Sequence, residues 1–478
     1  MYKTTIGLEI HTELKTNSKM FCGCKNDADE KEPNKNVCPI CLGHPGTMPA
    51  INKKAVEKVV KTGLALNCTI PLFTKFDRKN YFYPDLPKGY QISQYDKPLC
   101  EKGYLDINGK KIGITRVHLE EDTGKLIHPE GEKYSLVDFN RAGVPLMELV
   151  TEPDIESGDE ARKFAEELRL ILRYLDISEA NMEKGQMRIE VNISLSKNEN
   201  LGTKVEIKNL NSFRSVERSI EYEIKRQREL LESGRKIIQE TRGWNDSKGE
   251  TFSQREKESA HDYRYFPEPD LPPIRWKQAE IDEIKSTFSE LPNARRKRLK
   301  EEYKILSDET IEAFVLNKEF GDYFEKTISE LSPNLDHKKL LELIKLTSNY
   351  LITDLAALLK EEEYDLKSVT PENFAEFIAL IHNQTISSKV AKIILPEMLK
   401  TGSDPSHIIE ERGLTQVADE SDIKPIIEDL IKINQKAVSD YKKGEKNAIE
   451  FLVGQVLSKT KGKANPDVTR KIIEELLN

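Results

Sequence analysis

Alternating apolar and polar side chains in the first part of the chain limit its fold more strongly than any other feature. In residues 6–11 apolar side chains alternate with Glu9 and His11, and in residues 187–195 they alternate with polar side chains that include Glu190. A period of two is typical of strands with one buried and one polar face, as in antiparallel sheets. The sequence therefore predicts a largely antiparallel sheet with carboxylates on its polar face.

Helical patterns flank these strands and then take over the chain. Residues 159–175 and 215–231 are expected to form helices between the strands. The proline-rich segment 267–273 predicts an extended connector, after which Lys, Glu and Leu dominate. We therefore expect an α+β fold: an N-terminal β-rich domain with a largely antiparallel sheet and flanking helices at 1–280, an all-α helical domain at 281–405, and a small helical tail domain at 406–478.

The length and charge of the chain exclude several classes of protein. A chain of 478 residues is expected to form about two or three domains. No apolar run approaches the roughly 20 residues of a membrane helix. The strand pattern begins at once, so no signal peptide is predicted and a cytoplasmic location is expected. The net charge of −8 argues against a generally basic nucleic-acid surface.

Glu9 and His11 are two residues apart, so they project from the same face of the predicted strand. On their own, the two residues suit the solvated face of an edge strand. Strand-borne acids recur along the chain, however, at Glu120, Glu121, Glu148, Glu190 and Glu206. This recurrence predicts a metal site that is built from several strands.

Glu148 is the most informative of these acids because it lies within an apolar run, where an unpaired carboxylate is costly to bury. It is expected to meet a cation, and two kinds stay open: an arginine (Arg116, Arg141 or Arg188) or a metal ion. Carboxylates with a single histidine suit a hard divalent cation such as Mg²⁺, which can neutralise charge during phosphoryl transfer.

Some absent motifs restrict the chemistry further. The sequence has neither a GxxxxGK[ST] nor a GxGxxG motif, so a nucleotide, if bound, is not held by a standard glycine loop. It also has no nucleophile elbow and no Cys–His glutaminase site. If this chain takes part in a reaction that consumes ammonia from glutamine, another polypeptide must therefore release that ammonia.

Four of the six cysteines lie within one short segment. Cys22, Cys24, Cys38 and Cys41 form two close pairs, a spacing that suits a tetrahedral zinc ion. Because four protein ligands close the coordination sphere, this zinc is predicted to be structural, and the alternative is four reduced, unligated cysteines. Disulfides are not expected in a chain of this length without a secretory signal.

Two stretches interleave basic and aromatic residues, at 76–91 and 261–270. Each suits stacking on a nucleotide or an RNA end, and the alternative for each is a packed aromatic loop. The basic run 295–298 suits contact with phosphate or plain solvation. Residues 424–478 hold 11 Lys and Arg against 8 Asp and Glu, which favours the tail as an RNA contact.

Together these motifs resemble the B subunit of the aspartyl/glutamyl-tRNA amidotransferase, and the resemblance covers essentially the whole chain. The segments that carry it are 6–16, 76–94, 119–125, 138–149, 206–212 and 262–270, with 451–466 similar to the family's tail domain. The resemblance implies a β-rich cradle, then a helical domain, then a helical tail that engages tRNA.

The resemblance also implies a reaction and partners. The family's A, B and C subunits would form a heterotrimer that acts on misacylated Asp-tRNA(Asn) and Glu-tRNA(Gln). The A subunit would be a glutaminase that releases ammonia. The B subunit would use ATP and Mg²⁺ to phosphorylate the side-chain carboxylate, which ammonia then converts to the amide of Asn-tRNA(Asn) or Gln-tRNA(Gln).

Individual residues take roles by the same resemblance. Glu9, His11, Glu121 and Glu148 would be the catalytic residues and the Mg²⁺ ligands. The cofactor-binding set, for contacts with ATP or the acceptor end, would be Lys79, Tyr81, Lys208, Glu120 and Glu190. Two other classes of function stay open: a noncatalytic zinc-containing RNA-binding module and a metal-dependent phosphohydrolase that acts alone. Converging carboxylates disfavour an RNA adaptor, because without a cation they repel phosphate.

Overall fold

The chain divides into two units in the computed structural model, Met1–Pro292 and Asn293–Asn478, and each is described by itself. The structure describes residues 2–197, 200–256, 263–331, 336–361, 364–414, 420–443, 445, 447–460, 464 and 466–477. Within these ranges no helix is both long and apolar enough to cross a membrane. The expected α+β class is confirmed, because a sheet with helices forms the first unit and helices form the second.

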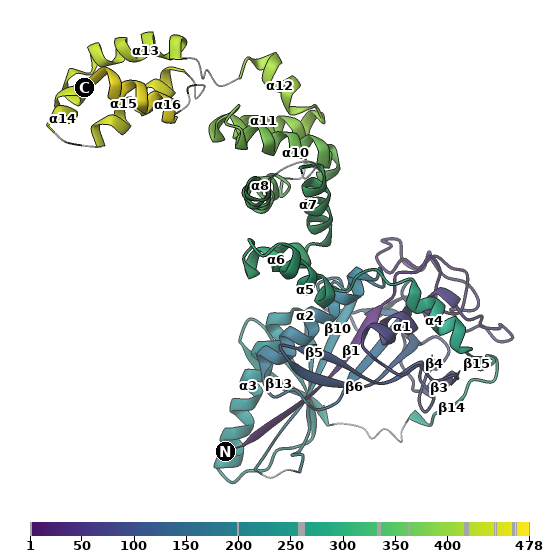
Figure 1. Ribbon diagram of the computed structural model, residues 1–478. Helices are drawn as coiled ribbons and strands as arrows, with labels where there is room; N and C mark the ends of the chain where they lie inside the picture. The colour runs from purple at the N-terminus through teal and green to yellow at the C-terminus, as the bar shows by residue number, and fades with distance from the viewer. Residues whose placement is uncertain are drawn as a thin grey trace. The chain divides into compact units, whose positions relative to one another are not determined.

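An eight-stranded sheet lies at the centre of the first unit, in the order β13-β12-β11-β10-β1-β9-β6-β5 (Figure 1). Its strands are β1 (Lys3–Glu13), β5 (Cys100–Ile107), β6 (Lys110–Glu121), β9 (Pro145–Thr151), β10 (Met187–Ser196), β11 (Val205–Leu210), β12 (Glu240–Asn245) and β13 (Glu250–Glu256). Every neighbouring pair is antiparallel except β11 with β12, which confirms the largely antiparallel sheet. Because β1 lies between β9 and β10, the edge-strand interpretation of Glu9 and His11 is wrong.

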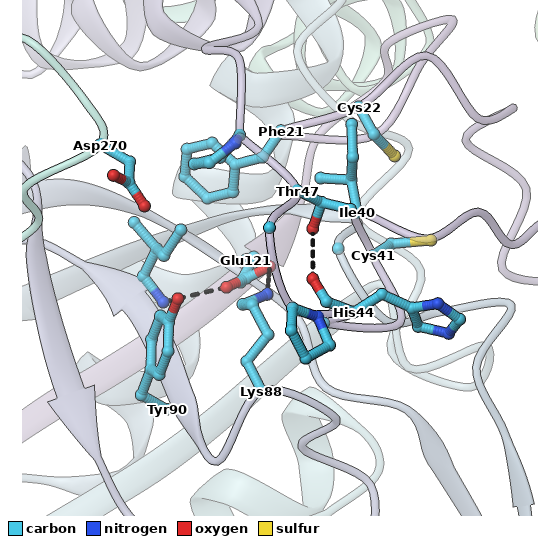
Figure 2. A pocket seen from close by; sticks show the side chains of 16 residues that line it. Phe21, Cys22, Ile40, Cys41, His44, Thr47, Lys88, Tyr90, Glu121 and Asp270 are labelled. Atoms are coloured by element: carbon cyan, nitrogen blue, oxygen red, sulfur yellow. Dashed lines mark hydrogen bonds and ion pairs between the residues drawn. The ribbon is translucent and has the colours of Figure 1, made fainter.

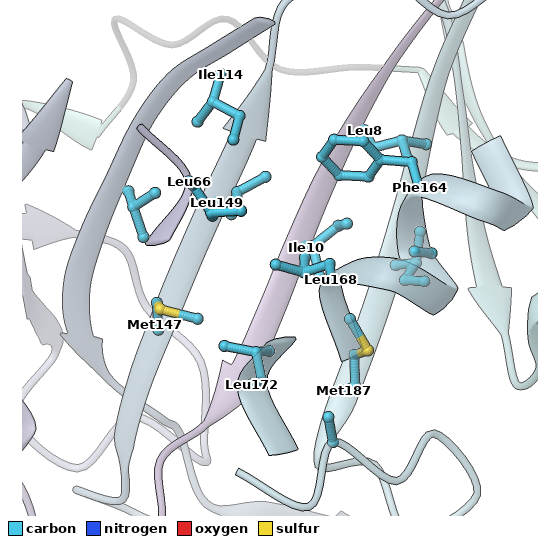
Figure 3. Close-up of a cluster of buried hydrophobic side chains, with 14 of the residues drawn as sticks. Leu8, Ile10, Leu66, Ile114, Met147, Leu149, Phe164, Leu168, Leu172 and Met187 are labelled. Carbon is cyan, nitrogen blue, oxygen red and sulfur yellow. The ribbon is translucent and has the colours of Figure 1, made fainter. Parts of the chain in front are cut away.

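Helices cover one face of this sheet and form the hydrophobic core with it. They are α1 (Lys53–Ala65), α2 (Gly158–Tyr174), α3 (Phe213–Glu232) and α4 (Gln278–Ser286), and α2 and α3 have nearly the predicted bounds. Figure 3 shows Phe164 and Leu168 of α2 beside Leu8 and Ile10 of β1, all of them fully buried. The polar residues that alternate with Leu8 and Ile10 therefore project from the opposite face.

The two basic and aromatic stretches pair with each other in a smaller sheet. Its strands are, in order, β14 (Phe266–Pro267), β3 (Asp77–Asn80) and β4 (Tyr90–Ser93). Phe266 lies opposite Arg78, whose guanidinium donates to the two carboxylate oxygens of Glu268 at 2.7 and 2.9 Å. His261 and Asp262 of the second stretch lie outside the described residues. Two further strand pairs are β2 (Phe73–Thr74) with β15 (Ile274–Arg275) and β7 (Lys125–Ile127) with β8 (Leu136–Asp138).

The second unit is helical throughout its described residues. Its helices are α5 (Pro292–Glu302), α6 (Asp308–Leu316), α7 (Lys318–Leu331), α8 (His337–Tyr350), α9 (Ala356–Leu358), α10 (Pro371–His382), α11 (Ser388–Thr401), α12 (Pro405–Arg412), α13 (Glu420–Ile433), α14 (Gln435–Lys442), α15 (Asn447–Lys459) and α16 (Pro466–Leu477), with short π and 3-10 turns at Leu351–Leu355 and Leu366–Ser368. Helices α13 to α16 share an apolar core that includes Ile427, Leu452 and Ile473. The domain boundary expected between residues 405 and 406 stays a prediction.

The basic run at 295–298 lies in α5 and is engaged within the helical unit. Arg295 donates to Asp322 at 2.6 Å, and Arg298 donates to Glu325 at 2.5 Å. These guanidinium groups already have carboxylate partners, which disfavours the run as a phosphate contact. Of the segment 451–466, which resembles the family's tail domain, residues 461–463 and 465 lie outside the described ranges.

Candidate active site

The strand register brings ionisable side chains from distant segments together on the polar face of the large sheet. His11 of β1 and His118 of β6 both lie opposite Glu148 of β9, the strand between them. Directly opposed side chains in an antiparallel pair have Cβ atoms about 5 Å apart. The three residues therefore form one row across three strands, and Glu120 lies two residues from His118 on the same face.

Glu148 is the centre of a carboxylate–histidine cluster, which we define as Glu9, His11, His118, Glu120 and Glu148. Its Oε2 atom lies 3.3 Å from Nε2 of His11 and 3.4 Å from Nε2 of His118. Glu120 is 3.7 Å from each of these two nitrogens. Potential ligand atoms of Glu9, His11 and Glu148 lie within 4.8 Å of one another, as do those of His118, Glu120 and Glu148. Glu120 and His118 are each 2% exposed, so the cluster is largely removed from water.

Burial and charge act in opposite directions on most of these groups. Burial disfavours the imidazolium of His11, but the hydrogen bond and charge of Glu148 outweigh it and raise the His11 pKa to about 9. Burial also disfavours the imidazolium of His118, but the charge of Glu148 raises the His118 pKa in spite of it. Although burial opposes it, the two histidines hold the pKa of Glu148 well below its usual range. Burial and the charges of Glu148 and Glu190 raise the pKa of Glu9. The cluster therefore requires positive charge, which protons or a divalent cation can supply.

Of the three arginines considered as partners of Glu148, Arg116 reaches it, with Nη2 3.5 Å from Oε1. Arg141 and Arg188 instead contact Asp122, at 3.7 and 2.7 Å. Arg116 thus supplies part of the positive charge beside Glu148, while the other carboxylate oxygen faces the two histidines. Glu148 therefore pairs with Arg116 and contacts both histidines at the same time.

A second group of carboxylates borders the cluster on β10 and β11. Potential ligand atoms of Glu9, Glu190 and Glu206 lie within 4.8 Å of one another. The ammonium of Lys208 lies 2.8 Å from Glu190 and 4.0 Å from Glu206, and Thr241 donates to Glu206 at 2.7 Å. Lys208 therefore supplies cationic charge to this group, and Glu9 is the carboxylate that the two groups share.

Lys79 of β3 and Tyr81, which directly follows β3, lie at the border of the cluster. The Lys79 ammonium lies 5.9 Å from the centre of the Tyr81 ring and 5.0 Å from that of Tyr263. Burial works against its charge, but the carboxylates of Glu120 and Glu148 raise the pKa of Lys79 above its ordinary value. Lys79 is therefore a charged group suited to a phosphate or carboxylate of a substrate.

Glu121 does not join the cluster, although it is predicted to be one of the cation ligands. Lys88 donates to its carboxylate at 2.7 Å and the Ile92 amide donates to it at 3.0 Å, on the other side of β6. Strand alternation is the physical reason, because His118 and Glu120 project from one face of β6 and Glu121 from the other. The predicted set lacks His118, although its two-residue spacing from Glu120 places both on the polar face.

Glu121 instead lines a cavity of about 200 Å³ beside the cysteine segment (Figure 2). Lys88 lies against Glu121 in this view, and Cys22, Cys41 and His44 line the cavity from the cysteine segment. No member of the carboxylate–histidine cluster lines it. The cavity therefore connects the Lys88–Glu121 ion pair to the cysteines and belongs to a separate part of the unit.

The four cysteines predicted to bind zinc, which we call the cysteine knuckle, come together, with sulfur atoms of Cys22, Cys24, Cys38 and Cys41 within 4.8 Å of one another. A hydrogen bond from Cys22 is the largest of the effects that lower the Cys41 pKa to about 4, whereas burial raises the Cys24 pKa to about 11. The Cys38 amide donates to the Cys41 sulfur at 3.1 Å, and the ammonium of the fully buried Lys19 lies 3.8 Å from it. Four convergent thiols beside a buried cation fit a structural zinc–thiolate site.

Known proteins are similar to this chain along its full length. A family model described as the GatB/GatE catalytic domain matches residues 4–282, and one described as the GatB domain matches residues 322–477. The chain is 49% identical to the B subunit of the aspartyl/glutamyl-tRNA(Asn/Gln) amidotransferase of Caldanaerobacter subterraneus over 486 residues, which cover 100% of this chain and 99% of that protein.

Two relatives of the same name cover the chain equally well. The B subunit of Brevibacillus brevis is 47% identical over 485 residues, and that of Persephonella marina is 49% identical over 484 residues, with 100% of this chain and 99% of each relative covered. These matches extend through both structural units. The chain therefore belongs to the family of aspartyl/glutamyl-tRNA(Asn/Gln) amidotransferase B subunits.

Proposed function

We propose that this chain is the ATP-dependent subunit of a cytoplasmic, glutamine-dependent tRNA amidotransferase, a ligase that forms carbon–nitrogen bonds. It transfers the γ-phosphoryl group of ATP to the side-chain carboxylate of Asp or Glu wrongly attached to tRNA(Asn) or tRNA(Gln), leaving ADP. Ammonia from the glutaminase, the A subunit, then forms the amide and releases inorganic phosphate, and the heterotrimer also contains a C subunit. The names of the relatives, which are all B subunits, support a multisubunit enzyme that acts on aminoacylated tRNA.

The carboxylate–histidine cluster is the observation that carries this proposal. Glu148 is 5% exposed and lies within 3.4 Å of two histidine nitrogens on neighbouring strands. Neither a packed core nor a solvated surface needs several carboxylates and two histidines in one buried contact, whereas active sites commonly contain such perturbed groups. A noncatalytic RNA-binding module has no use for this negative charge beside phosphate.

The donor set of the cluster fits a hard divalent cation. Carboxylate oxygens of Glu9, Glu120 and Glu148, with imidazole nitrogens of His11 and His118, would hold it. When bound there, Mg²⁺ would neutralise negative charge on the oxygens of ATP and of the substrate carboxylate. Arg116 keeps one Glu148 oxygen paired, and so fixes the orientation of the carboxylate between the two imidazole rings.

Lysines on either side of the cluster would bind the anionic parts of the substrates. Lys79 borders Glu120 and Glu148 and matches the charge of a phosphate or of the carboxylate to be activated. Lys208, which contacts Glu190 at 2.8 Å, would bind phosphate from the β11 side of the sheet. Tyr81, whose ring lies 5.9 Å from the Lys79 ammonium, would limit the access of water to it.

Glu148→Ala and Glu9→Ala in the assembled heterotrimer test the proposal. Both variants are expected to lose ATP-dependent phosphorylation of Glu-tRNA(Gln), while the partner's glutaminase activity continues because ammonia is made on another polypeptide. Glu152→Ala is the matched control, since Glu152 is an exposed carboxylate immediately beyond β9. If both cluster variants transamidate at close to the wild-type rate, the site assignment is wrong and the noncatalytic alternative is favoured.

A further inference from the structure

Four tyrosine rings form a continuous strip that begins beside the carboxylate–histidine cluster. Tyr81, Tyr263, Tyr265 and Tyr95 contact one another in that order, with ring centroids 6.0, 6.2 and 4.4 Å apart. The first two contacts are edge-to-face, whereas Tyr95 stacks on Tyr265 with 10° between the ring planes. We call these four residues the tyrosine strip.

The inner end of the tyrosine strip borders the groups proposed to bind the cation and the substrates. The Lys79 ammonium lies 5.0 Å from the centre of the Tyr263 ring. Burial raises the pKa of Tyr265 to about 12, and the nearby charges that act on this ring include Lys79, Glu120 and Glu148. A ligand that lies along the tyrosine strip would therefore reach the cluster with its inner end.

The outer end of the tyrosine strip is open to solvent. Tyr95 is 58% exposed, so one face of its ring is available although the other stacks on Tyr265. Phe82, Tyr83 and Phe266, on the same small sheet and the loop after β3, are also exposed. Exposed aromatic rings gathered in one place contribute little to folding and are typical of binding surfaces.

The backbone between two members of the tyrosine strip has an uncommon conformation. Arg264 has a φ of 43°, in the left-handed region that few residues other than glycine adopt. The Asn80 side-chain amide holds this turn by donating to the Arg264 carbonyl at 2.9 Å. The turn brings the Tyr263 and Tyr265 rings into contact while Arg264 stays exposed, and such strain is concentrated at functional sites.

We propose that the tyrosine strip binds the unpaired 3′ end of the acylated tRNA by stacking on its nucleobases, with Arg264 supplying charge for its phosphates. The proposal rests on the proposed function, which brings an acylated RNA end to the cluster. Stacking on aromatic side chains is the common way in which proteins hold single-stranded RNA. Several rings that lead from exposed Tyr95 to Lys79 suit a run of nucleotides, whereas the adenine of ATP needs one ring.

Binding of the assembled heterotrimer to tRNA(Gln), with and without its unpaired 3′ nucleotides, tests this proposal. In the wild type, removing these nucleotides is expected to weaken binding by about tenfold or more, the loss of at least one base stack. Tyr95→Leu is expected to lose about tenfold in affinity for intact tRNA and to become less sensitive than the wild type to the removal, because one of the four rings is gone. Tyr95→Phe keeps the ring and is expected to bind as the wild type does.

Salt dependence tests the part of Arg264 separately. Arg264→Gln is expected to lower the slope of log affinity against log salt by about 0.7, the value for one phosphate contact on a single strand. Tyr104→Leu is the matched control for the ring substitutions. Tyr104 also has a lysine beside its ring, Lys111 at 4.1 Å, but it lies on β5 at the edge of the large sheet and outside the tyrosine strip. This control is expected to change neither tRNA affinity nor its salt dependence.

Two results would overturn the proposal. One is a Tyr95→Leu variant that loses as much affinity as the wild type when the 3′ nucleotides are removed. The other is a raised KM for ATP in Tyr95→Leu with unchanged tRNA affinity, which would assign the ring to the adenine of ATP. The binding measurement does not depend on catalysis. A wild-type complex whose tRNA affinity falls when the 3′ nucleotides are removed, but which does not phosphorylate the amino acid, would therefore contradict the proposed function and leave this proposal standing.

Discussion

Replacing Glu148 with glutamine is expected to change both the proton affinity of His11 and the pH dependence of folding stability. The substitution keeps the size of the side chain but removes the charge that His11 and His118 both contact. The His11 pKa, now about 9, is expected to fall toward or below its ordinary value of about 6.5. The physical reason is that burial, which disfavours the imidazolium, then meets less opposition.

The size of the effect follows from the His11 pKa. A rise from 6.5 to about 9 is about 2.5 pH units, and at about 1.4 kcal/mol per unit it corresponds to roughly 3 kcal/mol of folding free energy. Because the folded-state pKa is the higher one, this stabilisation is fully present below pH 6.5 and is lost as the pH rises through about 9. Glu148→Gln is therefore expected to be about 3 kcal/mol less stable than the wild type near pH 6 and to approach it near pH 9.

The two tryptophans of the chain provide the assay. Trp244 and Trp276 both lie in the first unit, so their fluorescence reports its unfolding separately from that of the helical unit. Denaturant unfolding in the presence of a chelator, at the two pH values, gives the free energies to be compared. Glu152→Gln, an exposed carboxylate just beyond β9, is the control. A stability difference that does not vary with pH, or a His11 pKa that stays near 9 in Glu148→Gln, would refute the reasoning.

Further changes separate the roles of neighbouring groups. His118→Gln is expected to weaken Mn²⁺ binding by about tenfold or more, and Glu121→Gln to leave it unchanged, as measured by paramagnetic resonance titration; the reverse pattern would make Glu121 the ligand. Metal analysis is expected to find one zinc per chain in the wild type and none in Cys38→Ser. Zinc-free wild type with four titratable thiols would contradict the knuckle. Removing residues 406–478 is expected to weaken tRNA binding by the heterotrimer, and unchanged affinity would count against the tail as an RNA contact.

Strand alternation predicted the faces of the large sheet but not the neighbours of each strand. Leu8 and Ile10 must face the core, so Glu9 and His11 had to share the polar face. That β9 lies between β1 and β6, with Glu148 beside both histidines, depends on a register between segments far apart in the sequence. No local pattern contains that register, because pairing depends on the packing of the complete sheet.

Strand alternation also decides which of the neighbouring acids Glu120 and Glu121 faces the cluster. Both acids lie at the end of β6, and the family resemblance favoured Glu121. Val117 and Leu119 are fully buried in the core, which orients Glu120 toward the cluster and Glu121 toward Lys88. The convergence of the four cysteines, in contrast, was predictable from spacing because they are close in the sequence, and a small loop needs no distant partner to bring them together.

The pairing of β14 with β3 also determines when the site is completed during protein synthesis. Arg78 and Glu268, which connect these strands, are 190 residues apart in the sequence. The growing chain contains every member of the carboxylate–histidine cluster once Glu148 has been added, but Tyr263 and Tyr265 follow much later. Contacts of such long sequence separation form late, because the intervening chain must first be ordered. The tyrosine strip is therefore completed later in synthesis than the carboxylate–histidine cluster beside it.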